Sequence, residues 1–144
     1  MANCGDDQLR AVKRISKQRL MQRDVRNLFG DGDDAEGEIR MHLRMKHRHI
    51  VAMHEVFDDS STVSLVMEVC RGGDLFDMIT DHAAKHNTGL SEPATGRVLR
   101  HLLLALAFLH DLHIVHRDVK CENVLLLENG VPIEDLWSVG TYKL

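Results

Sequence analysis

The chain has 144 residues, with 18 lysines and arginines against 22 aspartates and glutamates and a formal net charge of −4. This length accommodates one domain with a sizeable core, and 44% apolar with 28% charged residues is ordinary for a globular protein. The small acidic excess gives no basis for expecting nucleic acid as a partner, and the basic stretch 13–26 is interpreted as a solvated helix face.

Cysteine usage and hydropathy indicate the compartment. The three cysteines, Cys4, Cys70 and Cys121, are widely spaced and form no C-x-x-C pair. A disulfide framework is therefore not expected, and a reducing cytoplasmic or nuclear setting fits better. The longest apolar run, 102–109, is far shorter than the ~20 residues that span a bilayer, and the N-terminus has no apolar signal core. We expect a cytoplasmic protein, with the nucleus as the second possibility, and no membrane partner.

The first part of the chain predicts a strand at 9–16, where Ala11, Lys13 and Ile15 share one face, and a short helix at 17–28. Residues 30–37 form a glycine- and acid-rich loop. Its acids lack the glycine spacing of a calcium loop, so it is interpreted as a solvated insertion. A half-apolar helix is predicted at 38–46.

The second part predicts two strands, 50–57 and 63–69, joined by a turn-rich segment. Two helices follow. One starts behind Asp74 as its N-cap, and a long buried helix begins at the Ser-Glu-Pro of residues 91–93. The segment 114–127 is interpreted as strand, loop and strand.

The sequence HRDVKCEN at residues 116–123 carries the strongest chemical signal. His-Arg-Asp with an asparagine five residues beyond the aspartate is the pattern of a phosphoryl-transfer loop. In that chemistry Asp118 accepts the proton of an attacking hydroxyl, Lys120 neutralises charge on the transferred phosphoryl group, and Asn123 supplies an oxygen to Mg²⁺. Such transfer depends mostly on positioning and electrostatics, so holding all three groups on one loop matters.

On this loop the chain resembles the eukaryotic protein kinase family, and further motifs agree in order. Ala-Val-Lys at 11–13 is similar to the family's lysine strand, which implies that Lys13 grips the α- and β-phosphates of ATP. Residues 38–51 resemble its regulatory helix, which implies that Glu38 is the ion-pair partner of Lys13. The interval of 25 residues (38 − 13) is long for the family, and the acidic loop accounts for the excess.

Residues 65–79 resemble the family's fifth strand and hinge. The resemblance implies that Met67 is the gatekeeper, that the backbones of Glu68 and Cys70 meet the adenine edge, and that Asp74 lies near the ribose. The residues implied to sandwich the base are Ala11 above and Leu125 below.

The resemblance implies an α+β, bilobal, kinase-like fold that is truncated. A partial small lobe with an antiparallel sheet and one regulatory helix spans 9–67, the hinge spans 68–73, and residues 74–144 begin a helical large lobe. Lysine at position 120 is typical of serine/threonine kinases, so the resemblance implies a protein Ser/Thr hydroxyl as substrate. The family resemblance as a whole implies ATP and Mg²⁺ as cofactors. The sequences of the hinge and of the long helix resemble those of the calcium/calmodulin-dependent group.

The chain also departs from the family pattern. Gly5 is the only glycine in the twelve residues before Lys13, so these residues contain no G-x-G-x-x-G loop. Neither D-F-G nor A-P-E follows Asn123. Asp-Leu-Trp-Ser-Val-Gly at 135–140 resembles a later kinase motif on a buried helix, which indicates that the metal-binding segment is omitted near Gly130. Alternatively, Asp135 occupies the metal aspartate's place, 12 residues beyond Asn123 (135 − 123). The first interpretation is favoured, because Leu-Trp replaces Phe-Gly.

Three hypotheses follow from these departures. The chain is an incomplete serine/threonine kinase domain with weak or no activity, a non-catalytic kinase-derived binding module, or a truncated gene product. Incompleteness would also leave leucines of the long helix exposed and the lysine strand at an unpaired sheet edge. A metal site of His110, His113 and His116 is disfavoured, because the catalytic loop already accounts for His116 and histidine suits a helix end.

Overall fold

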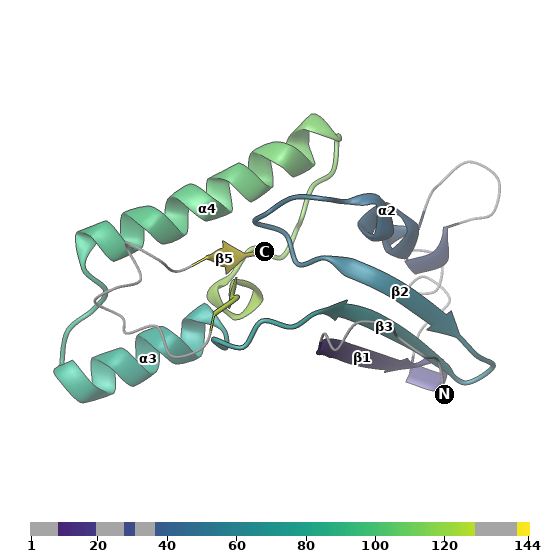
Figure 1. Ribbon diagram of the computed structural model, residues 1–144, viewed down its shortest axis with the longest axis horizontal. Helices are drawn as coiled ribbons and strands as arrows, with labels where there is room; N and C mark the ends of the chain where they lie inside the picture. Colours follow the sequence, from purple (N-terminus) through teal and green to yellow (C-terminus); the bar gives the residue numbers. More distant parts are fainter. Residues whose placement is uncertain (1–8, 20–27, 31–36, 129–140) are drawn as a thin grey trace. The chain divides into compact units, whose positions relative to one another are not determined.

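The computed structural model describes residues 9–19, 28–30, 37–128 and 141–144 (Figure 1). The chain divides into two compact units, the first made of 1–46 and 52–69 and the second of 47–51 and 70–144. The break between Val69 and Cys70 falls inside the stretch 68–73 that the sequence assigns to a hinge. Most of the helix expected at 17–28, most of the acidic loop and the 135–140 motif lie outside the described residues. Among the described helices, none combines the length and apolar character that a membrane span requires.

The first unit contains a three-stranded antiparallel sheet in the order β1-β3-β2. Its strands are β1 (Arg10–Ser16), β2 (Met53–Asp58) and β3 (Thr62–Glu68), and a short 3-10 turn, η1 (Lys17–Arg19), follows β1. All three strands were predicted, although β2 begins three residues later than expected. Alternation explains the central strand, because Val63 and Leu65 are buried while their neighbours are only half-buried. The lysine strand β1 lies at an edge of the described sheet, as expected.

The core of the first unit forms between this sheet and α2 (Glu38–Arg44). Four buried residues make its centre: Ile39, Met53, Val63 and Leu65. Val63 is fully buried, and Ile15 lies opposite it in the β1–β3 register. The half-apolar helix predicted at 38–46 is confirmed, although it ends at Arg44, two residues earlier than expected.

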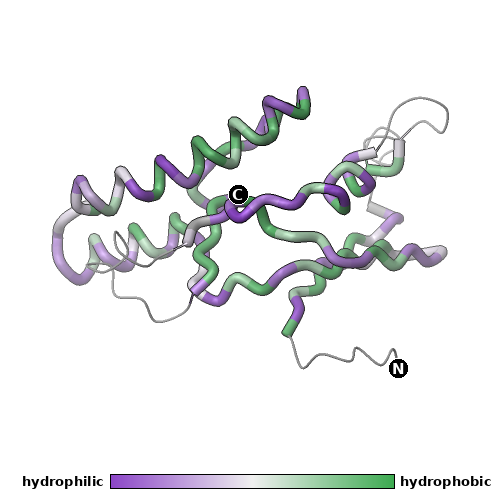
Figure 2. Tube along the Cα trace, turned by 45° about the horizontal axis from the view of Figure 1, so that its top comes forward, coloured by the Kyte–Doolittle hydropathy of each residue, from purple (hydrophilic) through white to green (hydrophobic). Residues whose placement is uncertain are grey.

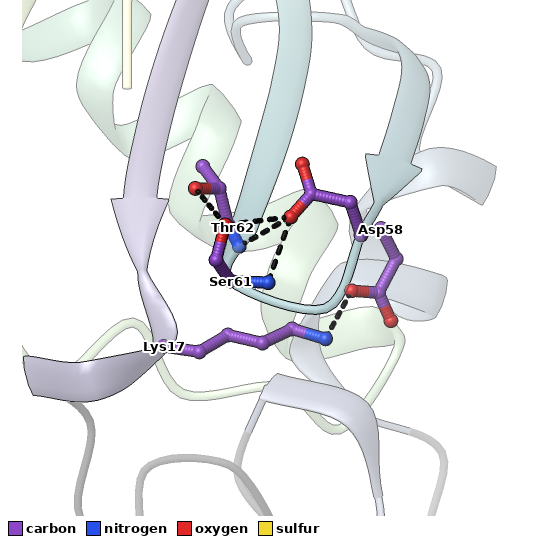
Figure 3. A network of polar contacts seen from close by, with 5 residues as sticks. Lys17, Asp58, Ser61 and Thr62 are labelled. Atoms are coloured by element: carbon purple, nitrogen blue, oxygen red, sulfur yellow. Dashed lines mark hydrogen bonds and ion pairs between the residues drawn. The ribbon is translucent and has the colours of Figure 1, made fainter.

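The β2–β3 turn is held by the side chain of Asp59, which accepts hydrogen bonds from the Ser61 N–H at 2.8 Å, the Ser61 hydroxyl at 3.0 Å and the Thr62 N–H at 2.7 Å. These bonds hold the pKa of Asp59 below its usual range. Beside the turn, Lys17 forms an ion pair with Asp58 (Figure 3). Aspartate suits this position because its short side chain can satisfy turn N–H groups two and three residues ahead.

In the second unit, α3 (Leu75–His86) starts where the sequence predicts. Asp74 is the N-cap, and its Oδ1 accepts from the Asp77 N–H at 2.8 Å. The helix ends at Asn87, which adopts the left-handed conformation (φ 53°) that terminates helices. Both boundaries therefore have local causes.

The long helix α4 (Glu92–Asp111) has Ser91 as its N-cap, and the Ser91 hydroxyl accepts a hydrogen bond from the Ala94 N–H at 3.4 Å. Apolar residues recur along its length (Figure 2). One face is buried, at helical spacing: Ala94, Val98, His101, Ala105 and Leu109. Leu99, Leu103 and Leu104 are exposed, as the sequence led us to expect.

The prediction of a strand at the start of 114–127 is wrong. The Ile114 N–H instead donates back to the Leu109 carbonyl at 2.9 Å, and His113 adopts a left-handed backbone (φ 59°). These residues therefore form the exit turn of α4. Strand pairing comes later, where β4 (Leu125–Leu126) pairs antiparallel with β5 (Tyr142–Lys143).

The core of the second unit combines α3, α4 and the segment that contains β4. Its buried centre consists of Leu75, Val98, Val124 and Leu126. The backbone adds direct ties, because the Leu75 N–H donates to the Val124 carbonyl at 2.8 Å and the Gly72 N–H to the Leu126 carbonyl at 2.9 Å. The start of α3 and the segment after the catalytic loop are thereby fixed to each other.

Candidate active site

The loop 116–123 follows the exit turn of α4 and has a strained backbone at Arg117. Arg117 has a positive φ of 64°, a conformation that residues other than glycine seldom adopt. The loop ends in η2 (Cys121–Asn123), where the Asn123 N–H donates to the Lys120 carbonyl at 3.0 Å. Unusual backbone conformations cost about 1–3 kcal/mol and cluster at functional sites. Here the strained residue directly precedes Asp118.

Three predicted catalytic residues meet on this loop. The Asn123 side-chain amide donates to the Asp118 carbonyl at 2.7 Å and to Asp118 Oδ2 at 2.8 Å. Lys120 Nζ lies 3.0 Å from the same Oδ2. The Asp118 N–H also lies 3.4 Å from His116 Nδ1. The aspartate is therefore oriented from its backbone and from one carboxylate oxygen, while its side chain stays 64% exposed.

The hydrogen bonds from Lys120 and then Asn123 hold the pKa of Asp118 below its usual range. A carboxylate with a lowered pKa stays ionised but is a weak general base. Asp118 is thus suited to accepting and aiming a hydroxyl group. That role agrees with a loose phosphoryl-transfer transition state, which needs positioning more than strong proton abstraction.

The side-chain amide of Asn123 is suited to act as a Mg²⁺ ligand. An amide has two N–H donors and one oxygen, and both recorded bonds of the Asn123 amide use its nitrogen. Its oxygen therefore faces away from Asp118. A neutral amide oxygen is a suitable Mg²⁺ ligand. The side chain can brace the aspartate and ligate a cation at once.

Asp74 and Leu125, which the resemblance assigns to the ribose and the adenine base, form an isolated antiparallel bridge. Nearby, a methyl group at Gly72 would lie 2.2 Å from the Glu128 carbonyl oxygen, so only glycine fits this close approach. Cys70, the predicted adenine contact in this unit, is half-buried. The second unit therefore holds Asp74 and Leu125 side by side.

In the first unit, Ala11 lies directly opposite Met67 in the β1–β3 register. The Glu68 N–H donates to the Ala52 carbonyl at 2.9 Å, so that group is already bonded. Lys13 pairs in register with Leu65 and is exposed, as is Glu38 in the first turn of α2. Within the described part of the chain, no ion pair joins Lys13 to Glu38.

Two further expectations concern metals. Asp135, the alternative metal ligand, lies outside the described residues. Among the residues that the structure does describe, no group of three or more histidine, cysteine or acidic side chains is placed to hold a metal ion. The left-handed Arg117 and the β4–β5 pairing were not foreseen, because no composition or periodicity signal marks either one.

Comparisons with known proteins agree with this geometry. The protein kinase domain model matches residues 1–141. The serine/threonine-protein kinase DCLK3 of Mus musculus is 37% identical over 131 residues, which cover 87% of this chain and 16% of the relative. Calcium-dependent protein kinase 5 of Plasmodium berghei is 34% identical over 123 residues, covering 85% of this chain and 19% of the relative.

A solved structure shows the same fold. A crystal structure of Rad53 in complex with AMP-PNP superposes with a TM-score of 0.69 at 27% identity, covering 94% of this chain and 30% of the other. The chain thus spans less than a third of each of these proteins. It belongs to the eukaryotic protein kinase family, on the serine/threonine side, and its fold is a partial kinase fold.

Proposed function

We propose that the chain is the part of a serine/threonine protein kinase that carries the phosphoryl-transfer loop. The reaction would move the γ-phosphoryl group of ATP to a protein Ser/Thr hydroxyl. The observation that carries this proposal is the convergence of Lys120 Nζ and Asn123 Nδ2 on Asp118 Oδ2, at 3.0 and 2.8 Å. In this role Asp118 aims the hydroxyl, Lys120 neutralises the phosphoryl group and Asn123 contributes a metal ligand.

The proposed nucleotide contacts are those that the family resemblance assigns. Lys13 grips the phosphates with Glu38 as its partner, and Asp74 reaches the ribose. The other nucleotide contacts in this proposal are Ala11, Met67, Glu68, Cys70 and Leu125. Bound Mg²⁺ would supply positive charge to the phosphates, and Asn123 is the described residue whose chemistry fits it. The Ala11–Met67 register and the Asp74–Leu125 bridge support these assignments.

We further infer that residues 1–144 alone transfer phosphate weakly or not at all. Between Asn123 and Leu144 the sequence carries no Asp-Phe-Gly. Without a charged metal ligand, a site loses a preorganised electrostatic contribution, and the loss of one such group typically costs about 3–4 kcal/mol of barrier. A non-catalytic, kinase-derived binding module is the second candidate, and the same sequence feature favours it. A cytoplasmic setting is proposed from cysteine usage.

Radiolabelled phosphate transfer to a mixed Ser/Thr peptide library, compared with Asp118→Asn, tests the proposal. A catalytic chain should transfer label above the level of that variant. Equal signal from both proteins would rule out catalysis by this chain and favour the binding module. A thermal-shift series with Mg-ATP, with Lys13→Met as the comparison, separates nucleotide binding from transfer. The absence of any shift at millimolar ATP would contradict the nucleotide assignments.

A further inference from the structure

Outside the catalytic loop, the second unit contains a row of stacked rings. The ring of His47 stacks on Phe108 (centroids 4.9 Å apart, planes at 17°), and His49 stacks on His101 (4.1 Å, 20°). An edge contact at 5.6 Å between His47 and His49 joins the two stacks. His49 is 2% exposed and His101 7% exposed. The proposed phosphoryl transfer uses none of these four side chains.

The ring row holds the segment 47–51 on α4, and backbone hydrogen bonds tie the same segment to Leu144. The Val51 N–H donates to the Leu144 carbonyl at 3.0 Å, and the Leu144 N–H donates to the His49 carbonyl at 2.9 Å. Ile50 and Val51 are buried as a result. The segment that links α2 to β2 in the chain is therefore anchored in the second unit by rings and by strand-like bonds.

The surroundings of His101 oppose a positive charge on its ring. The pKa of His101 is lowered to about 4, and burial is the largest cause. The charged and titratable groups of the described chain that lower this pKa further are all basic: His49, Arg97, Arg48 and Arg100.

His47 is in the same situation. Burial lowers its pKa, as do Lys143 on β5 and Arg48. Among the described residues, the basic groups that lower these two pKa values belong to the segment 47–51, α4 and β5. A proton added to the His101 ring would lie about 4 Å from a second histidine and would be opposed by Arg48, Arg97 and Arg100.

We propose that the His49–His101 stack is an acid-sensitive latch, in which protonation of His101 opens the stack and releases residues 47–51 from both α4 and Leu144. The closed form requires a neutral His101 ring, whereas the open form allows that ring to enter water and take up a proton. Because protonation favours the open form, the latch is fully closed above about pH 6.5 and loosens as the pH falls towards about 4. One proton of this kind raises the opening constant roughly tenfold between pH 7.5 and 5.5.

Amide hydrogen exchange by NMR on the 144-residue protein tests the latch. After correction for intrinsic exchange, the opening constants of the Val51 and Leu144 amides should rise about tenfold from pH 7.5 to 5.5. The Leu75 amide, which donates to Val124 elsewhere in the same unit, should stay constant. An equal rise at Leu75 would show general acid unfolding and overturn the latch, as would unchanged exchange at Val51.

A matched pair of variants assigns the effect to one ring. His101→Phe keeps a flat ring in the stack but cannot take up a proton, so the tenfold change at Val51 should fall below about threefold. The control is His82→Phe, in the exposed His82–His86 stack on α3, where the centroids lie 4.6 Å apart. That variant should keep the full change. A full change in His101→Phe would overturn the assignment.

If His101→Phe does not fold, the ring signals of His101 in the unmodified protein decide the question. Their titration midpoint should lie well below 6.5 and should follow the opening of the Val51 amide. A midpoint near 6.5 would contradict the latch.

Discussion

The side-chain nitrogen of Asn123 donates two hydrogen bonds to Asp118, one to the backbone carbonyl at 2.7 Å and one to Oδ2 at 2.8 Å. The same Oδ2 receives Lys120 Nζ at 3.0 Å. A single carboxylate oxygen is thus held by two donors, and the Asn123 bond to the backbone keeps the loop closed over five residues. The electrostatic state of Asp118 therefore depends on two neighbours that can be changed one at a time.

Removing the amide should raise the pKa of Asp118. Asn123→Ala deletes two hydrogen bonds and leaves Lys120 in place, so the pKa should rise towards its usual value without reaching it. Lys120→Met should raise it further, because the lysine bond has the larger effect. Carbon-13 NMR titration of the Asp118 carboxyl group measures both changes. Glu122→Gln removes an exposed neighbouring negative charge and keeps both bonds, so it should leave the pKa unchanged or lower it. A rise in that control would point to general loop disruption.

Gly72→Ala should destabilise the protein by about 1–3 kcal/mol, because the new methyl group would overlap the Glu128 carbonyl and the Leu126 side chain. Urea unfolding followed by circular dichroism gives the free energy of unfolding. Gly89→Ala is the matched control, since nothing lies within 4 Å of a methyl group there. Equal stability of the two variants would show that the close approach at Gly72 does not constrain the fold.

Asp74 caps α3 through a hydrogen bond, and two substitutions test whether that bond or the negative charge stabilises the helix. Asp74→Ala removes the α3 N-cap and should cost about 1 kcal/mol in unfolding free energy. Asp74→Asn keeps a capping oxygen, so its stability should stay within a few tenths of a kcal/mol of the original. Urea unfolding checks both values, and Asp81→Ala within α3 serves as control. If Asp74→Asn were as unstable as Asp74→Ala, the cap would depend on charge and not on the hydrogen bond.

The core of the first unit should depend strongly on Val63. This side chain is fully buried between α2 and the sheet, so Val63→Ala loses two methyl groups and leaves a cavity, at a cost of about 2–3 kcal/mol. Val12→Ala, on the exposed part of β1, should cost less than about 1 kcal/mol. Thermal unfolding of the two variants side by side measures the contrast. Similar losses would show that the core of this unit is not centred on β3.

Sequence reasoning succeeded where the cause of a structure is local. The N-caps Asp74 and Ser91 lie where short polar side chains precede apolar periodic runs, and both helices start there. The strand β3 follows directly from its alternating pattern. The closeness of Asp118, Lys120 and Asn123 was also predictable, because the three residues lie within a span of six.

Features that depend on distant partners were not predictable from the residues alone. Ile114 and Val115 have the composition of a strand, yet the exit turn of α4 engages the Ile114 N–H. β4 has two residues, and its partner β5 lies beyond the 135–140 motif. On sequence alone, the burial of His101 was equally hidden, because a histidine on an amphipathic helix is not marked as internal until its neighbours are known.

The chain passes between its two units three times, at 46/47, 51/52 and 69/70. One cut in the expected hinge would therefore leave His47–Val51 on the first fragment and their ring and backbone partners on the second. Ile50 and Val51, both buried in the intact chain, would then face water. The two units are consequently not interchangeable parts. A chimaera that exchanged the first unit with that of a relative would have to keep these five residues matched to α4 and to the C-terminal strand.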